Sequence, residues 1–580
     1  MVWSDPKQAP AFTATGPLHE IPLRILINKS LPAWLFIFSL LVFAGGLGGD
    51  FVMDDWPVIK ENSRITDSQY IPDYFTRGVW ANTDLAAQTG VGGHSLYRPL
   101  FLLTLNLEHR LWGDNPLGYH AVNLLLHATN TVLVYFLILG LLGSGQRMIA
   151  AMAAALFAVH PVHVESVAWI AGLTDPLVSL FLLADFLLHR RARQAADARQ
   201  AWPYAIAAPL CFALALLTKE NAIFFPLLLL VDDALLQRGG LSLKSTVLRY
   251  TPYLLLLVVY FMLRSNALGT GQQGALAQMQ LQNLPTLVIF LAHYLQLLVF
   301  PTPLEYYYSP PANHGFSLVI GGLILLAALA YLPRALRRQQ RAYVLALAWA
   351  TIPLLPALPI ALLDEPVFAE RVLYLPTLGF ALFIAWLLRL AQGFRRPLEA
   401  TVKTGVIVFL LVFSMASLSE FSQWENDKSF YSQAMKTSPD SYKPMAGLAA
   451  VYAREKNFEA AIDLYLKAAK LAPRQSDQLD FTENAARLYG QTGKIKQSEA
   501  LYEDILRRAP QRSSAWVGLG NNALARGDQQ QALAFYEKAY AADPNNRVAA
   551  YNLALVYQQT GNPERAAFFQ RRAQALAGGR

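Results

Sequence analysis

The sequence predicts an all-α protein made of a polytopic membrane domain followed by a solenoid of paired helices. Three observations predict this fold class. The chain of 580 residues is 54% hydrophobic and 15% charged, whereas a soluble domain has about 25% charged residues. Apolar stretches of about 15 to 22 residues recur in the first part of the chain, and about 20 such residues cross a bilayer core. A helical repeat pattern follows them.

The charged residues divide the chain into two parts. Residues 421–580 contain 37 Asp, Glu, Lys and Arg in 160 positions, about 23%, and residues 1–420 contain about 12%. The first part is too poor in charge to coat a water-facing surface, and the second has a soluble composition. We therefore predict a cytoplasmic N-terminal segment 1–30, a membrane domain 31–420 and a soluble domain 421–580.

The loops between the apolar segments set the predicted topology, because short loops rich in Lys and Arg stay in the cytoplasm. Segment 285–300 ends in Phe300-Pro301-Thr302-Pro303, and if it is re-entrant or interfacial, every basic loop falls inside. The N-terminus is then cytoplasmic and the chain has about eleven spans. The predicted apolar segments are 31–48, 117–142, 148–160, 176–189, 203–218, 222–236, 250–264, 285–300, 316–333, 342–363, 372–390 and 404–420.

This topology also explains the net charge of +8. Most of the positive charge marks the cytoplasmic loops, so we expect no nucleic-acid partner. The single cysteine, Cys211, excludes an intrachain disulfide and a Cys-based metal site. The C-terminal part and four loops are predicted to face the outside. The four loops are 49–116, 161–175, 265–315 and 364–371.

The C-terminal part repeats every 34 residues, as from Pro510 to Pro544 and from Pro439 to Pro473. This is the period of tetratricopeptide repeats. Small and large side chains alternate as the interlocking of paired helices requires, and about four repeats are predicted. Such arrays bind peptides or neighbouring subunits and carry no chemistry of their own. The strongest copy contains Trp516, Leu519, Gly520, Ala523, Gly527, Ala532, Tyr536, Ala539 and Pro544.

Two adjacent carboxylates, Asp54 and Asp55, follow the first span in the box Phe-Val-Met-Asp-Asp-Trp. Close to apolar surface and to each other, one of them should have a raised pKa and could accept a proton from a hydroxyl. The alternative is an interfacial acidic loop with an aromatic anchor. The residues alone leave both interpretations open.

A second cluster begins with the segment Tyr97-Arg98-Pro99-Leu100 and continues on the predicted helix after Gly118. His120, Asn123 and His127 fall at i, i+3 and i+7, which places them in one stripe of that helix. Polar stripes in a span face protein or a watery cavity. Hydrogen bonding between helices and contact with a ligand are equally compatible with this stripe.

A third cluster, His160-Pro161-Val162-His163-Val164-Glu165, precedes Asp175 in a loop without Lys or Arg. Two imidazoles and a carboxylate are a known metal-ligand set. The spacing matches no standard helix-based zinc motif, however, and Pro161 breaks the geometry. We therefore expect hydrogen bonding within a site and no required metal or other cofactor, with metal binding as the alternative.

Two cations, Lys219 and Arg371, lie at the predicted outer ends of spans, where the loop rule disfavours positive charge. Each is adjacent to a glutamate, Glu220 or Glu370. A cation in this position needs a partner, either a local carboxylate or an anion. The sharper hypothesis is that Arg98, Lys219 and Arg371 bind the phosphate of a membrane lipid.

Together these motifs resemble the transmembrane and tetratricopeptide-repeat-containing O-mannosyltransferases and their bacterial relatives, which are multi-span glycosyltransferases of the GT-C fold. The resemblance covers nearly the whole chain and also includes Glu370-Arg371-Val372-Leu373-Tyr374-Leu375-Pro376. One departure is that Leu173 and Thr174 stand where animal members tend to have a basic residue before the loop aspartate.

The resemblance implies a polyprenyl-phosphate sugar as donor and transfer to an acceptor hydroxyl, typically of protein Ser or Thr, with inversion at the sugar carbon. It implies that Asp54 is the general base and that Asp55 positions the acceptor or sugar hydroxyls. Arg371, supported by Arg98 and Lys219, is the expected phosphate ligand. The expected pocket is lined by Tyr97, His120, Asn123, His160, His163, Glu165, Asp175, Glu220, Glu370 and Tyr374.

The resemblance also implies partners and a location. The repeats would bind or present the acceptor protein, and the reaction would take place on the outer face of the bilayer. We expect a bacterial inner membrane with the repeats in the periplasm. The alternative function is a membrane-anchored scaffold for envelope protein assembly or secretion, which needs neither the Asp54 and Asp55 pair nor an outward Arg371.

Overall fold

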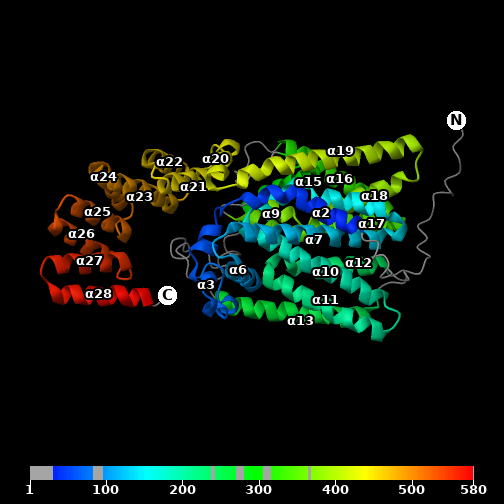
Figure 1. Ribbon diagram of the computed structural model, residues 1–580, viewed down its shortest axis with the longest axis horizontal. Helices are drawn as coiled ribbons and strands as arrows, with labels where there is room; N and C mark the ends of the chain where they lie inside the picture. The colour runs from blue at the N-terminus through cyan, green and yellow to red at the C-terminus, as the bar shows by residue number, and fades with distance from the viewer. Residues whose placement is uncertain are drawn as a thin grey trace. The chain divides into compact units, whose positions relative to one another are not determined.

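The computed structural model describes residues 30–81, 96–236, 242–269, 280–302, 304, 315–363 and 368–578. Within these ranges every regular element is a helix. The chain divides into two compact units, Met1–Asn426 and Asp427–Arg580, each of which is helical in Figure 1. The predicted segment 1–29 and parts of the predicted outer loops lie outside the described residues.

The first unit contains the apolar helices. Judged by length and composition, seven of the described helices could cross a membrane, or eight if the bent pair of α8 and α9 is one span. The seven are α2 (Ser30–Phe43), α7 (Pro116–Leu142), α10 (Thr174–Gln194), α11 (Ala198–Thr218), α13 (Leu243–Leu268), α16 (Gly315–Arg337) and α19 (Arg396–Glu420).

The remaining helices of this unit are shorter. Three predicted spans correspond to α12, α17 and α18, which have 12, 11 and 15 residues. At 1.5 Å per residue these rise about 16 to 23 Å, less than a hydrocarbon core of about 30 Å. The figure of eleven spans therefore stays a prediction. The bounds are α3 (Ser63–Thr66), α4 (Asp73–Thr76), α6 (Pro99–Trp112), α8 (Arg147–Ala158), α9 (Val164–Ala168), α12 (Phe225–Leu236), α15 (Leu284–Val299), α17 (Arg341–Thr351) and α18 (Thr377–Ala391).

Helix α15 is the segment predicted to be re-entrant or interfacial, and it has only 16 residues. It packs against α16 through small residues and polar contacts. A Cβ on Gly321 would lie 2.1 Å from the Ala292 oxygen, so only glycine permits this approach. His293 Nδ1 and Ser317 Oγ are 2.8 Å apart across the pair. Small residues with a hydrogen bond between helices are the usual packing of apolar helices in lipid.

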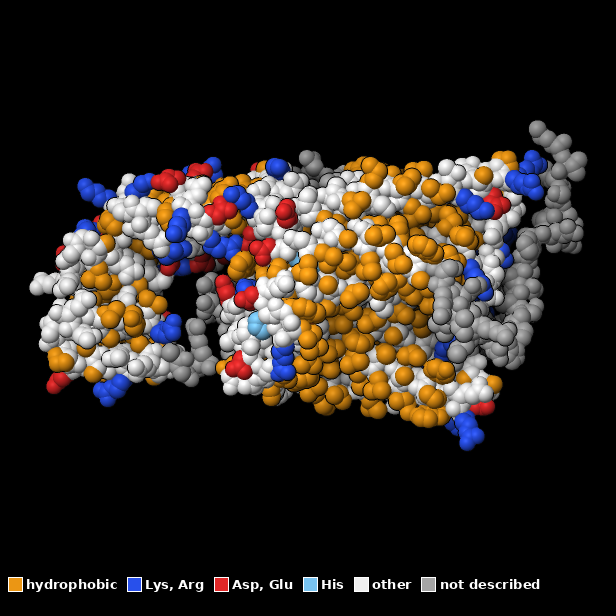
Figure 2. Space-filling view, viewed as in Figure 1, with side chains coloured by type: hydrophobic (Ala, Val, Ile, Leu, Met, Phe, Trp, Pro, Cys, Tyr) orange, Lys and Arg blue, Asp and Glu red, His pale blue; other side chains and the backbone are white. Residues whose placement is uncertain are grey.

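The surface of this unit is suited to a bilayer. Most residues of α13, α16 and α19 are exposed on the surface of the unit. Of the most apolar 18-residue stretch of each helix, only 17%, 11% and 17% is buried. Figure 2 shows the result on one face, where an apolar band carries almost no charge and charged side chains gather at its two ends. Because water-facing surfaces cannot be so apolar over such an area, this unit is an integral membrane domain.

The second unit is built of paired helices. Its core places large side chains against small ones, as the sequence pattern predicts. A Cβ on Gly520 would lie 2.4 Å from Tyr536 Cε1, and Ala523, Ala532 and Ala539 are fully buried. The predicted tetratricopeptide pattern is confirmed. The helices are α20 (Asp427–Thr437), α21 (Tyr442–Arg454), α22 (Phe458–Leu471), α23 (Gln475–Gln491), α24 (Ile495–Arg508), α25 (Ser513–Ala525), α26 (Gln529–Ala542), α27 (Arg547–Gln559) and α28 (Pro563–Gly578).

Helix α7 carries a buried polar stripe that organises the irregular segments of the membrane unit. Its side chains bond backbone carbonyls of segments outside α7, at Gly49 and within residues 158–176. The bonds are His120 Nε2 with the Gly49 oxygen (3.1 Å), Asn123 Nδ2 with the Trp169 and Ile170 oxygens (2.9 and 3.3 Å), His127 Nε2 with the Ala158 oxygen (2.9 Å) and Asn130 Nδ2 with the Pro176 oxygen (2.8 Å).

The stripe exists because non-helical backbone within apolar surroundings must find donors inside the protein. The four stripe positions fall at i, i+3, i+7 and i+10, on one face of the helix. His120 and Asn123, which the sequence left between interhelical hydrogen bonding and ligand contact, both bond main-chain oxygens of other segments in this structure.

Replacing Asn123 by alanine should destabilise the membrane unit. The carbonyls of Trp169 and Ile170 would each lose a buried donor, at a cost of about 1–3 kcal/mol. Thermal unfolding of the detergent-solubilised protein measures the effect. The matched control is Thr129→Ala, because the exposed Thr129 hydroxyl bonds only the Leu125 oxygen of its own helix. Equal midpoints for both variants would show that the stripe does not stabilise these segments.

Candidate active site

The two carboxylates after the first span have different surroundings. The loop turns at Met53, whose φ of 56° is in the left-handed region. Asp55 is fully buried, and its Oδ2 accepts from the Val52 N–H (2.9 Å) while its Oδ1 accepts from the Ala171 N–H (2.8 Å). Asp55 therefore ties the loop to itself and to segment 161–175.

Asp54 is the carboxylate available for chemistry. It is half-buried, and no described residue forms a hydrogen bond or ion pair with its side chain. Burial raises the pKa of Asp54 above its ordinary value, and the nearby charge of Arg371 partly offsets this. A carboxylate with a raised pKa and open acceptor positions is suited to taking a proton from a hydroxyl.

Three cation–carboxylate pairs accompany Asp54, and each joins distant parts of the chain. Arg371 donates to Glu165 from both its guanidinium and, at 2.7 Å, its backbone N–H. Lys219 Nζ lies 2.6 Å from Asp175 Oδ1. Arg98 forms a two-point pair with Glu220, at 3.0 Å from Nε and 2.6 Å from Nη2. The carboxylates of Glu165 and Asp175 both come from the predicted loop 161–175 or its end.

These pairs form one electrostatic cluster, since Arg98 and Lys219 both interact with the charge of Arg371. Burial alone would lower the pKa of Arg98, but the Glu220 carboxylate outweighs burial and raises it. Burial would likewise raise the pKa of Glu220, yet Arg98 lowers it to about 2. Burial lowers the pKa of Lys219, and Asp175 reduces that effect.

Arg371 is the most accessible of the three cations. Its side chain is 25% exposed, against 15% for Arg98 and 10% for Lys219. The Arg371 guanidinium also lies over the Trp169 ring, 5.3 Å from its centre. A guanidinium is a planar group with five N–H donors, and its geometry matches that of a phosphate.

Other predicted pocket residues support the frame of the site. Tyr97 is fully buried and donates to the Phe75 oxygen (3.2 Å), which anchors the segment before Arg98. The Tyr374 hydroxyl lies 2.9 Å from His127 Nδ1 and accepts from Asn130 Nδ2 (3.1 Å). Glu370 is buried and acts electrostatically on Tyr294. Tyr374 thus connects the Arg371 segment to α7.

The predicted metal-ligand residues point to separate partners. His160 Nε2 lies 3.1 Å from the Leu298 oxygen and His163 Nε2 lies 2.8 Å from Thr377 Oγ1, whereas Glu165 pairs with Arg371. Across the described residues no group of three or more His, Cys, Asp and Glu side chains could hold a metal ion. The arrangement favours the hydrogen-bonding interpretation of this loop.

Sequence reasoning missed three contributors to this region. Asn130 continues the stripe at i+10 and could have been found by extending the same period. Trp169 was not predicted to be a site residue, although its ring contacts the Arg371 guanidinium. Trp424 stacks on Trp169 with ring centres 6.4 Å apart. No local pattern identifies these two tryptophans, because their contacts join segments far apart in the chain.

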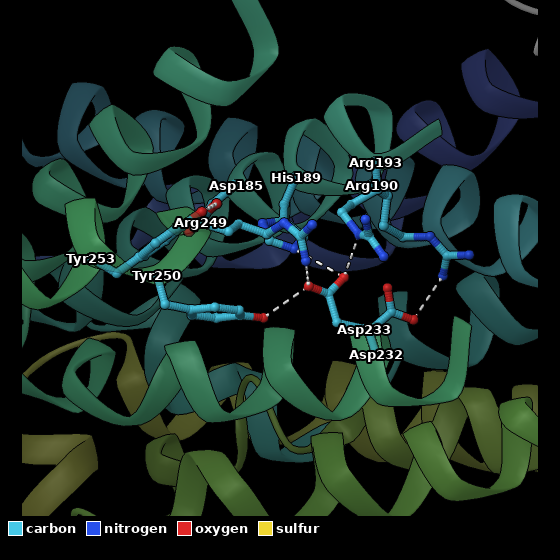
Figure 3. Close-up of polar contacts among 9 residues, drawn as sticks. All are labelled: Asp185, His189, Arg190, Arg193, Asp232, Asp233, Arg249, Tyr250 and Tyr253. Carbon is cyan, nitrogen blue, oxygen red and sulfur yellow. Dashed lines mark hydrogen bonds and ion pairs between the residues drawn. The ribbon is translucent and has the colours of Figure 1, made fainter. Parts of the chain in front are cut away.

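A second charged cluster joins α10, α12 and α13 and is drawn in Figure 3. Its centre is the fully buried Asp233. Asp233 Oδ1 accepts from Arg193 (2.9 Å) and lies 3.4 Å from His189, and Oδ2 accepts from Arg249 (2.6 Å) and Tyr250 (3.3 Å).

This second cluster holds helices together. Arg190 pairs with Asp232 (3.2 Å), and Tyr253 donates to Asp185 (2.8 Å). Helix α13 exposes most of its apolar side chains, and its buried face is formed by tyrosines such as Tyr250 and Tyr253. Asp233 has four donors around it, and the cluster joins α10, α12 and α13 through paired charges.

Both units of the chain are similar to known proteins. Residues 94–266 match the family model of dolichyl-phosphate-mannose-protein mannosyltransferase, and residues 443–475, 484–547 and 523–575 match tetratricopeptide-repeat models. A repeat protein, MamA from Desulfovibrio magneticus, is similar to 28% of the chain and 88% of its own, at 15% identity and a TM-score of 0.23.

Named relatives align across both units. The human protein O-mannosyl-transferase TMTC3 is 24% identical, covering 89% of this chain and 64% of its own length. The protein O-mannosyl-transferase F38B6.6 of Caenorhabditis elegans is 27% identical, covering 76% of this chain and 62% of its own length. This chain thus spans less than two thirds of these relatives. The mouse protein TMTC2 is 33% identical over 32% of this chain and 22% of its own length.

The matched mannosyltransferase region contains Arg98, Glu165, Asp175, Lys219 and Glu220 of the site, and the matched repeats form the second unit. Over most of its length this chain is thus similar to several protein O-mannosyl-transferases, and its second unit is similar to tetratricopeptide repeats.

Proposed function

We propose that this protein transfers a sugar from a polyprenyl-phosphate-linked donor to a hydroxyl of an acceptor protein, with inversion at the sugar carbon. The observation that carries the proposal is the half-buried Asp54 carboxylate, without a hydrogen-bond partner among the described residues, beside the accessible Arg371. The names of the relatives make mannose the first sugar to test.

In the proposed reaction each charged group has a defined task. Asp54 accepts the proton of the acceptor hydroxyl while that oxygen bonds to the anomeric carbon of the sugar. The bond from the anomeric carbon to the phosphate oxygen breaks, and its electron pair stays on polyprenyl phosphate. Arg371 stabilises this charge, with Arg98 and Lys219 behind it. Phosphate needs no general acid to leave.

Asp55 has a different task from the one expected for a second carboxylate. Both of its oxygens accept backbone N–H groups, of Val52 and Ala171. We therefore propose that Asp55 positions Asp54 by fixing the loop and does not bind the sugar or the acceptor hydroxyl. This separates the two adjacent carboxylates into one base and one loop anchor.

The proposed location is the outer face of a bacterial inner membrane, with the repeats in the periplasm and presenting the acceptor. Support comes from α10, which has Asp175 at its start and Arg190 and Arg193 near its end. About 18 residues of helix separate these ends by about 27 Å, close to the thickness of the hydrocarbon core. Since basic residues favour the cytoplasmic side, the Asp54 site belongs to the opposite side.

Substitution of the two carboxylates tests the proposal. With mannosyl polyprenyl phosphate and co-purifying secreted proteins as acceptors, Asp54→Asn should lower transfer at least about 100-fold, because a general base contributes about 10²–10⁴. Its thermal midpoint should not fall, since burial disfavours the Asp54 charge. Asp55→Asn should lower both transfer and stability, by about 1–3 kcal/mol for the lost acceptor. Equal transfer by Asp54→Asn and wild type would remove Asp54 as base.

The same transfer assay distinguishes the glycosyltransferase hypothesis from the scaffold hypothesis. Transfer from at least one polyprenyl-phosphate sugar is expected for the wild-type chain. If the folded wild-type protein transfers no sugar from any such donor, the scaffold interpretation is favoured.

The pH dependence of kcat/KM should follow the titration of the Asp54 carboxylate. Because burial raises its pKa, the acid limb of kcat/KM should lie above the ordinary aspartate value of about 3.9, with activity lost as pH falls. Arg371 lowers this pKa, so Arg371→Gln should move the acid limb to higher pH and reduce transfer about 100-fold. Arg371→Lys, which keeps the charge, should leave the limb in place. An unmoved limb in Arg371→Gln would show that Asp54 is not the titrating group.

Chelation tests whether the reaction needs a metal. His160, His163 and Glu165 each have a protein partner, so we propose that no metal is required. Overnight dialysis against EDTA, followed by assay in metal-free buffer, should leave the initial rate within about twofold of the untreated protein. A loss restored by one divalent cation would reinstate the metal site at this loop.

A further inference from the structure

The turn that follows the last apolar helix is built into the Asp54 site. Helix α19 ends at Glu420, the turn occupies Phe421–Trp424, and α20 begins at Asp427. Trp424 is buried, as is Trp169 beneath it. The function described above does not use this turn, yet it contacts both the loop that carries Asp54 and the segment that carries Trp169.

Three groups of the turn make these contacts. The Glu425 carbonyl accepts the N–H of Asp50 at 2.8 Å. The Trp424 ring stacks on Trp169, with centres 6.4 Å apart and an interplanar angle of 29°. The Phe421 ring packs edge-on against Phe43, at 5.1 Å, where α2 ends.

Glycines at the start of the loop make this approach possible. A Cβ on Gly49 would lie 3.1 Å from His120 Nε2 and 3.3 Å from the Trp424 oxygen. A Cβ on Gly46 would lie 3.0 Å from Cε1 of Phe421. The loop therefore lies against the turn on one side and against the α7 stripe on the other, and an added methyl group would displace its neighbours by a few tenths of an ångström.

The turn reaches the phosphate side of the site through Trp169. The Arg371 guanidinium lies over the Trp169 ring at 5.3 Å, and the Trp169 oxygen is held by Asn123 at 2.9 Å. The indole of Trp169 is thus in contact with Arg371 and with Trp424, while its backbone is fixed by α7. Removal of the Trp424 ring would free one side of the indole that supports Arg371.

We infer that Trp424 is a positioning residue: by stacking on Trp169 it holds the support of Arg371, while Glu425 fixes the start of the Asp54 loop. The inference rests on the proposed function for its catalytic consequence. Only Glu425 and Asn426 separate this turn from α20, the first helix of the repeats, so the polypeptide that enters the repeats is also part of the frame of the site.

The test uses full-length protein in detergent and two readouts. Binding of polyprenyl monophosphate, measured by calorimetry, requires no turnover. Trp424→Ala should weaken it about tenfold, the loss expected for a guanidinium that is no longer supported. In the transfer assay kcat should fall about 10- to 100-fold, because misplacement of a catalytic group is costly, while KM for the acceptor protein changes less than about twofold. Trp424→Phe, which retains a ring, should stay within about threefold of wild type.

Two further variants keep the test decisive. Trp202→Ala is the matched control, because Trp202 is 58% exposed, and it should behave as wild type. Gly49→Ala keeps the Trp424 side chain and acts at the Trp424 backbone oxygen, 3.3 Å from the added Cβ; the extended backbone of Gly49, with φ −70° and ψ 156°, accepts alanine. It should lower kcat about tenfold, and it decides the question if Trp424→Ala does not fold.

Several results would overturn the inference. One is an affinity of Trp424→Ala for polyprenyl monophosphate equal to that of the wild type. Another is a kcat of Trp424→Phe as low as that of Trp424→Ala. A third is a change in Trp424→Ala that affects only KM for the acceptor protein. If wild-type protein binds polyprenyl monophosphate but transfers no sugar, the proposed function fails, and the phosphate affinities of the variants still test the role of Trp424.

Discussion

The requirement that buried backbone groups be hydrogen-bonded shapes the membrane unit. The chain leaves helical geometry beside the first loop, between α8 and α10, and before α18, all in apolar surroundings. Unpaired carbonyls would be costly there. The polar stripe of α7 supplies donors to Gly49, Ala158, Trp169 and Pro176. One helix therefore helps to position the segments that carry Asp54, Glu165 and Arg371.

Charge pairing gives the site its second constraint. Arg98, Lys219 and Arg371 each have a carboxylate partner from another segment. These pairs hold the cations in place and make their burial tolerable. Asp54 differs from the other carboxylates of the cluster because the described residues give it no such partner. The candidate site thus combines a set of paired charges with one carboxylate, Asp54, that takes the proton in the proposed reaction, an arrangement expected of a pre-organised active site.

The sequence located the site but did not describe its pairing. Asp54, Arg98, Lys219 and Arg371 stood out because charges are rare in the first 420 residues. Local reasoning offered adjacent glutamates as partners, whereas the structure pairs Lys219 with Asp175 and Arg371 with Glu165. Likewise Asp54 and Asp55 are indistinguishable in sequence, and only the backbone donors Val52 and Ala171 separate them. Side-chain partners brought together by folding leave no local signal.

By itself the sequence determined the all-α class, the membrane and repeat parts, the 34-residue period and the polar stripe of α7. Each of these follows from composition or from a period along one helix, which are local properties. Only the tertiary structure decided which carboxylate is buried, which cation is exposed, and that the turn with Trp424 contacts the Asp54 loop. These features depend on contacts between residues tens to hundreds of positions apart, and such contacts exist only after the helices have packed.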